Sequence, residues 1–161
     1  MKQVWAPWRI DYILSPKGEE CVFCTIQKEA NDEDNLVLYR GKFVYIVMNK
    51  YPYNTGHLLV VPYRHVHDVL DVTLEESQEM WKLQNLCVTI VRIALGAQGC
   101  NIGINLGSVA GAGIADHLHL HIVPRWANDS SFLPVLADVR VIPEHLRITY
   151  QKLLKAIEEH I

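Results

Sequence analysis

Three histidines alternate with apolar residues in His117-Leu118-His119-Leu120-His121-Ile122. A β-strand sends successive side chains to opposite faces, so a strand over residues 117–123 places the three imidazoles on one face and the apolar side chains against the core. Same-face neighbours lie about 6–7 Å apart, and such imidazoles disfavour one another's positive charge near neutral pH. A neutral imidazole is a nucleophile. The pattern therefore favours catalysis by histidine; a metal-binding strand is the alternative.

This H-x-H-x-H motif, together with Asn49 and the block Thr55-Gly56-His57-Leu58-Leu59-Val60-Val61-Pro62, resembles the histidine triad (HIT) family over residues 21 to about 126. The resemblance implies that His119 attacks the α-phosphorus of a nucleotide and forms a nucleotidyl-histidine. It also implies that His121 stabilises charge on the phosphate and that His117 has a supporting role. An imidazole nucleophile suits this chemistry because it divides one difficult phosphoryl displacement into two easier ones.

Polar groups around the histidines are candidates for nucleotide binding. Asn105 and the main-chain amides of residues 107–113, including those of Gly111 and Gly113, can form an anion-binding concavity because glycine lets the backbone approach closely. The family resemblance adds Asn49 as a ribose contact and His57 as an active-site histidine. A structural alternative stays open for each: Asn49 could cap a loop, and His57 could be a histidine buried in the core.

Cys21 and Cys24 bring two thiolates together at a spacing that zinc prefers, but a structural zinc site needs four ligands. The resemblance implies His65 and His117 as the other two, with His57 and His67 as alternatives for the third ligand. Such a zinc ion is expected to be structural, and we expect no organic cofactor. A thioredoxin-like redox role is disfavoured because this C-x-x-C does not lie in a βαβ unit.

The sequence indicates less clearly which acceptor completes the reaction. Water, inorganic phosphate or a sugar phosphate can each resolve a nucleotidyl-histidine. Trp5-Ala6-Pro7-Trp8-Arg9, with Val123-Pro124-Arg125-Trp126, resembles the branch of the family that includes bacterial diadenosine tetraphosphate phosphorylases. This favours a diadenosine polyphosphate phosphorylase. A hydrolase of dinucleoside polyphosphates or nucleoside phosphoramidates is the enzymatic alternative, and a nucleotide- or zinc-binding module without activity is the non-enzymatic one.

Several elements must position these residues. The alternation of apolar residues and the turn signals predict five strands, at residues 36–40, 43–48, 57–62, 100–106 and 117–123, with a hairpin at Gly41 and Lys42. Thr73 and the glycine at position 96 bound a long helix over residues 73–97, and a second helix is expected over residues 143–160, with Pro143 in its first turn. The prediction is an α+β fold, an antiparallel sheet of about five strands with a long central helix and a C-terminal helix.

Composition limits the remaining classes. The 161 residues, half of them hydrophobic, suit one domain over residues 1–161, whose first 20 residues form an aromatic arm. A formal net charge of −3 with scattered cations disfavours a nucleic acid polymer as partner, and no apolar run approaches the ~20 residues that would span a membrane. We expect a cytoplasmic protein. The resemblance implies a homodimer that uses the long helix.

Overall fold

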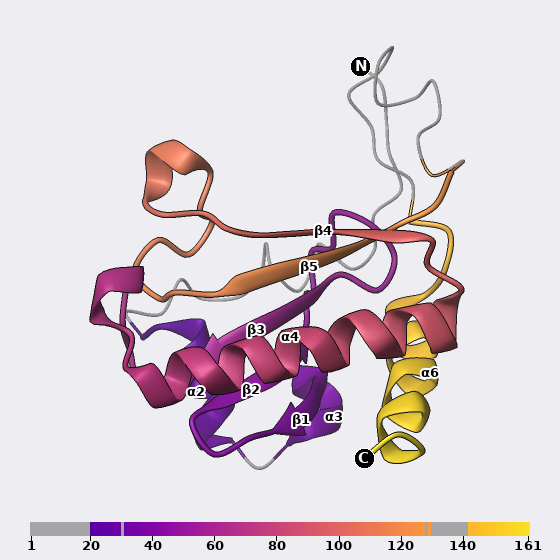
Figure 1. Ribbon diagram of the computed structural model, residues 1–161, viewed down its shortest axis with the longest axis horizontal. Helices are drawn as coiled ribbons and strands as arrows, with labels where there is room; N and C mark the ends of the chain where they lie inside the picture. Colours follow the sequence, from indigo (N-terminus) through magenta and orange to yellow (C-terminus); the bar gives the residue numbers. More distant parts are fainter. Residues whose placement is uncertain (1–19, 30, 128, 130–141) are drawn as a thin grey trace.

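The computed structural model describes residues 20–29, 31–127, 129 and 142–161, and it confirms the α+β prediction. Five strands form one antiparallel sheet in the order β1-β2-β3-β5-β4 (Figure 1). The strands are β1 (Val37–Arg40), β2 (Val44–Met48), β3 (Leu58–Pro62), β4 (Gly99–Ile104) and β5 (Leu120–Arg125). The predicted aromatic arm, residues 1–20, lies outside the described residues apart from its last one.

One face of the sheet is covered by α4 (Leu74–Leu95), and α6 (Leu146–Glu158) packs against α4 and β1 (Figure 1). Helix α4 begins at a capping box, in which Thr73 and Glu76 satisfy each other's main-chain N–H groups. It ends at Gly96, whose φ of 63° is left-handed. Apolar residues of α4, α6 and the sheet form the main core between these layers.

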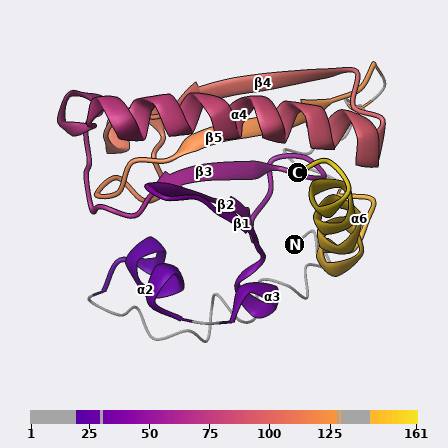
Figure 2. The same cartoon turned by 60° about the horizontal axis from the view of Figure 1, so that its bottom comes forward.

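The opposite face carries the short helices α2 (Val22–Lys28) and α3 (Asp32–Asn35), which Figure 2 shows on the far side of the sheet from α4. A second apolar cluster lies here, with Phe23 and Ile26 of α2 packed against strand residues Val37, Tyr45, Val47, Leu59 and Val61. Arg40 donates hydrogen bonds to the carbonyl oxygens of residues 26, 27 and 29. A guanidinium there satisfies free carbonyls at the end of α2 and holds this helix on the sheet.

Two predicted boundaries are wrong at the histidine strand. β5 begins at Leu120, so His117 and His119 lie in the extended segment before it, where the N–H of Leu118 donates to the carbonyl of Val66. β5 also continues through Pro124, where the sequence predicted its end. Proline is tolerated because β3 pairs with β5 only as far as Ile122, and the carbonyl of Pro124 accepts from the Asn54 side chain instead.

The helix predicted over residues 143–160 is shorter than expected. It begins at Leu146, with His145 as its N-cap, so Pro143 precedes the helix and does not lie in its first turn. Within the described part of the chain, no helix is long and apolar enough to cross a membrane.

Candidate active site

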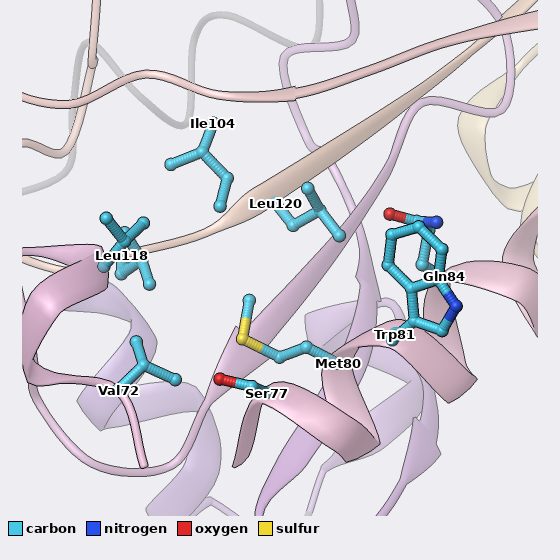
Figure 3. Close-up of a pocket in the computed structure, with 9 residues that line it drawn as sticks. Val72, Ser77, Met80, Trp81, Gln84, Ile104, Leu118 and Leu120 are labelled. Atoms are coloured by element: carbon cyan, nitrogen blue, oxygen red, sulfur yellow. The ribbon is translucent and has the colours of Figure 1, made fainter. Parts of the chain in front are cut away.

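The alternation around β5 separates the histidines from the core as the sequence predicted. Leu118, Leu120 and Ile122 belong to the core cluster beneath α4. Figure 3 shows Leu118 and Leu120 on that side, near Met80 of α4. The histidines alternate with these leucines and are themselves buried, with His119 and His121 6% and 8% exposed. The face away from α4 is thus a row of largely desolvated imidazoles.

His119 is held in one orientation by its own strand. Its Nδ1 lies 2.8 Å from the main-chain carbonyl oxygen of His117, which can only accept a hydrogen bond. The proton of neutral His119 therefore lies on Nδ1, and Nε2 carries the free electron pair. Burial lowers the pKa of His119, which favours this neutral form near pH 7. The ring packs on Phe23, with centroids 5.1 Å apart. His119 is thus a pre-oriented nitrogen nucleophile.

His121 lies beside His119, with ring centroids 4.7 Å apart, and it is joined to His57. The His57 Nε2 and His121 Nδ1 atoms are 2.9 Å apart. Burial, and secondly the proximity of His119, lower the pKa of His121 to about 4. Its Nε2 is buried and has no hydrogen-bond partner within the described residues. An orphaned polar atom at this depth is costly, which indicates a ligand that pairs with it.

The other predicted nucleotide contacts take different places. Asn49 bonds within its own loop, where its Oδ1 accepts from the N–H of Tyr51 and its Nδ2 lies 3.3 Å from His57 Nδ1. Asn105 is half-buried just after β4. Gly111 has a φ of 87°, a conformation that favours glycine, and it lies with Gly113 in the exposed loop that leads to His117. The predicted roles of these four residues in nucleotide binding stay predictions.

Cys21, Cys24, His65 and His117 form one cluster that could hold a metal ion, with their ligand atoms all within 4.8 Å of one another. Cys21 Sγ lies 3.3 Å from His117 Nδ1, and Cys24 Sγ lies 3.3 Å from His65 Nδ1. Of the alternatives for the third ligand, His57 is paired with His121, and His67 lies near Asp71. The structure thus brings His65 into the cluster.

The donor set fits a tetrahedral zinc ion. Zn–S and Zn–N bonds of usual length place sulfur and nitrogen ligands about 3.6 Å apart, close to the separations found here. His117 Nε2 lies 2.9 Å from the carbonyl oxygen of Pro62, so the ring proton is on Nε2 and Nδ1 presents its electron pair to the thiols. A metal-bound histidine typically donates its other N–H in this way.

Sequence reasoning missed the ion pair formed by Arg64, the residue before His65. The neighbouring Arg64 binds both carboxylate oxygens of Glu76, at 2.8 and 2.7 Å, and its Nη2 also donates to the carbonyl of Asp71. Glu76 is 3% exposed, and the hydrogen bonds from Arg64, ahead of those from Thr73, lower its pKa to about 2. Thr73 as an N-cap predicted the helix start, but nothing local indicated that Arg64 binds the carboxylate of Glu76.

Tyr53 was also missed. Its ring lies over the imidazoles of His57 and His121, with centroids 4.6 and 5.6 Å away. The only sequence signal was its position in the loop that leads to His57, which by itself is typical of many loop tyrosines. Phe23 was missed as well. It lies between Cys21 and Cys24, and because these cysteines lie beside His117, its ring packs on the histidines.

Comparison with known proteins matches this geometry to one family. Residues 30–128 match the family model for the HIT domain. The chain is 39% identical over 158 residues to a Mycobacterium tuberculosis protein named AP-4-A phosphorylase, and the match covers 92% of this chain and 80% of that protein. It is 36% identical over 91 residues to bis(5'-adenosyl)-triphosphatase of Saccharomyces cerevisiae, which covers 56% of this chain and 44% of that protein.

A solved structure supports the same assignment. A Zn-bound histidine triad family protein from Mycobacterium smegmatis superposes with a TM-score of 0.72 at 29% identity. The superposition covers 88% of this chain and 95% of that one. The two proteins therefore share the fold over most of their length.

Proposed function

Because the chain belongs to the HIT family, we propose that it cleaves the phosphoanhydride chain of dinucleoside polyphosphates through a nucleotidyl-histidine on His119. One observation carries this proposal. The hydrogen bond from His119 Nδ1 to the carbonyl of His117 leaves the electron pair of Nε2 available for attack, next to the Nε2 of His121, which has no hydrogen-bond partner among the described residues. Phosphoryl transfer needs a nucleophile and, beside it, a hydrogen-bond donor that can stabilise charge on the phosphate oxygens.

In the first step, His119 Nε2 attacks the α-phosphorus of diadenosine tetraphosphate. A P–N bond forms while the bond from that phosphorus to the bridging oxygen breaks, and the oxygen leaves with the electron pair as part of ATP. His121 donates a hydrogen bond from Nε2 to a phosphate oxygen, and its burial strengthens that bond. Asn105 and the main-chain N–H groups of residues 107–113 bind the other oxygens, and Asn49 binds the ribose.

In the second step, an acceptor oxygen attacks the adenylyl-histidine. The P–N bond breaks, Nε2 regains its electron pair, and the acceptor's proton passes to solvent. With inorganic phosphate as acceptor the product is ADP, and with water it is AMP. Phosphorolysis is favoured by the 39% identity to AP-4-A phosphorylase over most of the chain. Hydrolysis is the second candidate, supported by the 36% identity over 91 residues to bis(5'-adenosyl)-triphosphatase.

We also propose zinc as the metal held by Cys21, Cys24, His65 and His117, supported by the fit of the donor set and by the Zn-bound neighbour. The ion would supply structural cross-linking, not Lewis-acid catalysis, because it joins α2 to the segment that carries His117. His117 keeps its position through its hydrogen bond to Pro62, and its carbonyl in turn orients His119.

A homodimer is the proposed assembly. Leu74, Trp81 and Ile93 of α4 are between 60% and 70% exposed, and Ile102 is 43% exposed on β4, the edge strand of the sheet. A shallow apolar cavity of about 250 Å³ lies between α4 and β4, and Figure 3 shows Trp81 and Ile104 on opposite sides of it. Exposed apolar area beside a strand edge that no described residue pairs with favours contact with a second copy.

The deciding experiment is product analysis with diadenosine tetraphosphate, with and without inorganic phosphate. ATP plus ADP formed only with phosphate is the expected result. AMP plus ATP regardless of phosphate would instead identify a hydrolase. If neither pair of products forms and no acid-labile adenylyl-histidine can be trapped, the protein is a binding module and the proposed function is wrong.

A further inference from the structure

Tyr53 lies over both imidazoles of the His57–His121 pair. Its ring plane is 17° from that of His121 and 41° from that of His57, so it stacks on the first and tilts over the second. The side chain is 43% exposed, whereas His57 is fully buried and His121 is 8% exposed. The phenol ring therefore forms a cover between these two imidazoles and the surroundings.

The main-chain N–H of Tyr53 determines which nitrogen atoms of His57 and His121 carry protons. The N–H of Tyr53 donates to His57 Nδ1 at 3.1 Å, and the Nδ2 amide of Asn49 lies 3.3 Å from the same atom. Two donors at Nδ1 exclude a proton there, so neutral His57 carries its proton on Nε2. That proton is donated to His121 Nδ1, 2.9 Å away. Neutral His121 must then carry its own proton on Nε2, the atom without a partner among the described residues.

We propose that the ring of Tyr53 is a positioning group for the reaction on His119: it keeps the His57–His121 hydrogen bond in the single tautomer that directs the Nε2–H of His121 at the bound phosphate. This inference rests on the proposed function. It adds a residue outside the histidine motif to the machinery of phosphate stabilisation.

The Tyr53 ring is needed because the χ2 torsion of a histidine is only weakly restricted, so the imidazole of His121 could otherwise turn over. A 180° turn of His121 would exchange Nδ1 with a carbon atom, break the bond to His57 and remove the donor from the phosphate. The planes of His57 and His121 are 37° apart, so both rings must be held for the bond to stay linear. A stacked aromatic ring restrains both planes and keeps competing water away from the pair.

The test uses Tyr53→Ala, which removes the ring, and Tyr53→Phe, which keeps the ring and removes only the hydroxyl. Histidine ¹⁵N NMR of the full-length protein reports which nitrogen of His121 carries the proton. We expect a single Nε2–H tautomer in the wild type and in Tyr53→Phe. In Tyr53→Ala we expect the two ¹⁵N shifts of His121 to move toward each other, as a mixture of tautomers requires.

Kinetics supply the second measurement. Loss of a well-aimed donor lowers kcat more than it raises KM, so Tyr53→Ala should lose roughly tenfold or more in kcat, with KM changed by less than about threefold. Tyr53→Phe should keep wild-type kcat. Tyr51→Ala, which removes another exposed tyrosine ring from the same loop, is the matched control and should leave the tautomer unchanged.

An unchanged His121 tautomer and an unchanged kcat in a folded Tyr53→Ala would overturn the inference. So would equal loss of kcat in Tyr53→Phe and Tyr53→Ala, because the hydroxyl would then matter instead of the ring. The NMR measurement needs no substrate. If the wild type failed to turn over dinucleoside polyphosphates, the proposed function would fail while the effect of Tyr53 on the tautomer could still be read.

Discussion

The main-chain carbonyl oxygen of His117 lies 2.8 Å from the Nδ1 of His119, while the side chain of His117 belongs to the metal-ligand cluster. One residue thus connects the two sites. Its imidazole lies against Cys21 and Cys24, and its carbonyl oxygen fixes the tautomer of His119, the proposed nucleophile. A substitution that displaces the metal-ligand cluster is therefore expected to change the orientation of His119 through the carbonyl of His117. Substitutions at one site or the other can distinguish the two roles.

His119→Ala should abolish turnover and leave nucleotide binding largely intact. The covalent step depends on one nitrogen, whereas binding is distributed over several groups. We expect kcat to fall by at least about 10³-fold, with the dissociation constant for a nucleotide changed by less than about fivefold. Initial rates and calorimetric titration measure the two quantities. His160→Ala, which removes an exposed histidine far along the chain, is the control, and retained turnover in His119→Ala would exclude the mechanism.

Cys21→Ser should lower the zinc content and the melting temperature. Metal binding to a site formed only in the folded protein adds directly to stability, and removal of one ligand weakens it. A loss of about 2 kcal/mol corresponds to a decrease of roughly 4–8 °C in Tm for a chain of this size. Atomic absorption and calorimetry provide the measurements, with Cys100→Ser as the matched control. Equal zinc content in Cys21→Ser and the wild type would contradict the proposed site.

Glu76→Gln should flatten the acid limb of the stability curve. The pKa of Glu76 is lowered to about 2 in the folded protein, below its value of 4.5 in the unfolded chain. Folding therefore favours the ionised form, and this stabilisation is complete above about pH 4.5 and is lost as the pH falls toward 2. After allowance for the half-exposed Arg64, it is worth about 2 kcal/mol.

Urea unfolding of Glu76→Gln between pH 3 and 7 measures that effect. The exposed Glu75, in the same helical turn, provides the matched control as Glu75→Gln. We expect the two variants to differ most at pH 7 and least at pH 3. A constant difference across this range would mean that the Arg64 ion pair contributes nothing that depends on ionisation.

Trp81→Glu should convert the proposed dimer to a monomer. A carboxylate at the centre of an apolar contact leaves a charge buried without a partner, which costs several kcal/mol at an interface. Light scattering during gel filtration gives the mass in solution. Ile148→Glu is the control, because Ile148 is also an apolar residue that is 53% exposed but belongs to α6 and not to α4 or β4. A wild type that elutes as a monomer would remove the dimer from the proposal.

The fold was predictable where the signals are local. Thr73 and Gly96 bound α4 within two residues of the prediction because capping and left-handed φ are properties of the residue itself. The first residue of β5 was not predictable. It depends on where β3 stops pairing, and the two strands are about sixty residues apart in the sequence.

The site divides in the same way. The spacing of the histidines and of Cys21 and Cys24 is written in short motifs, so their grouping could be predicted. The family resemblance named His65, but the residues alone left His57 and His67 open. Which of three histidines within about ten residues reaches the cysteines depends on the course of the chain through β3 and the turn after it. Tyr53 contacts His121 through space, and no spacing rule predicts such a contact.

The side chains from His117 to Ile122 alternate between the histidine row and the core, so the number of residues in this segment cannot change without altering both faces. Deletion of a single residue there would turn the side chains on one side of the deletion to the opposite face, and would place leucines among the imidazoles and imidazoles in the core. The loop before His117 does not share this alternation, and a Cβ added at Gly113 would meet no atom of the described residues within 4 Å. Residues 117–122 can therefore accept the exchange of one side chain for another more readily than any change in length.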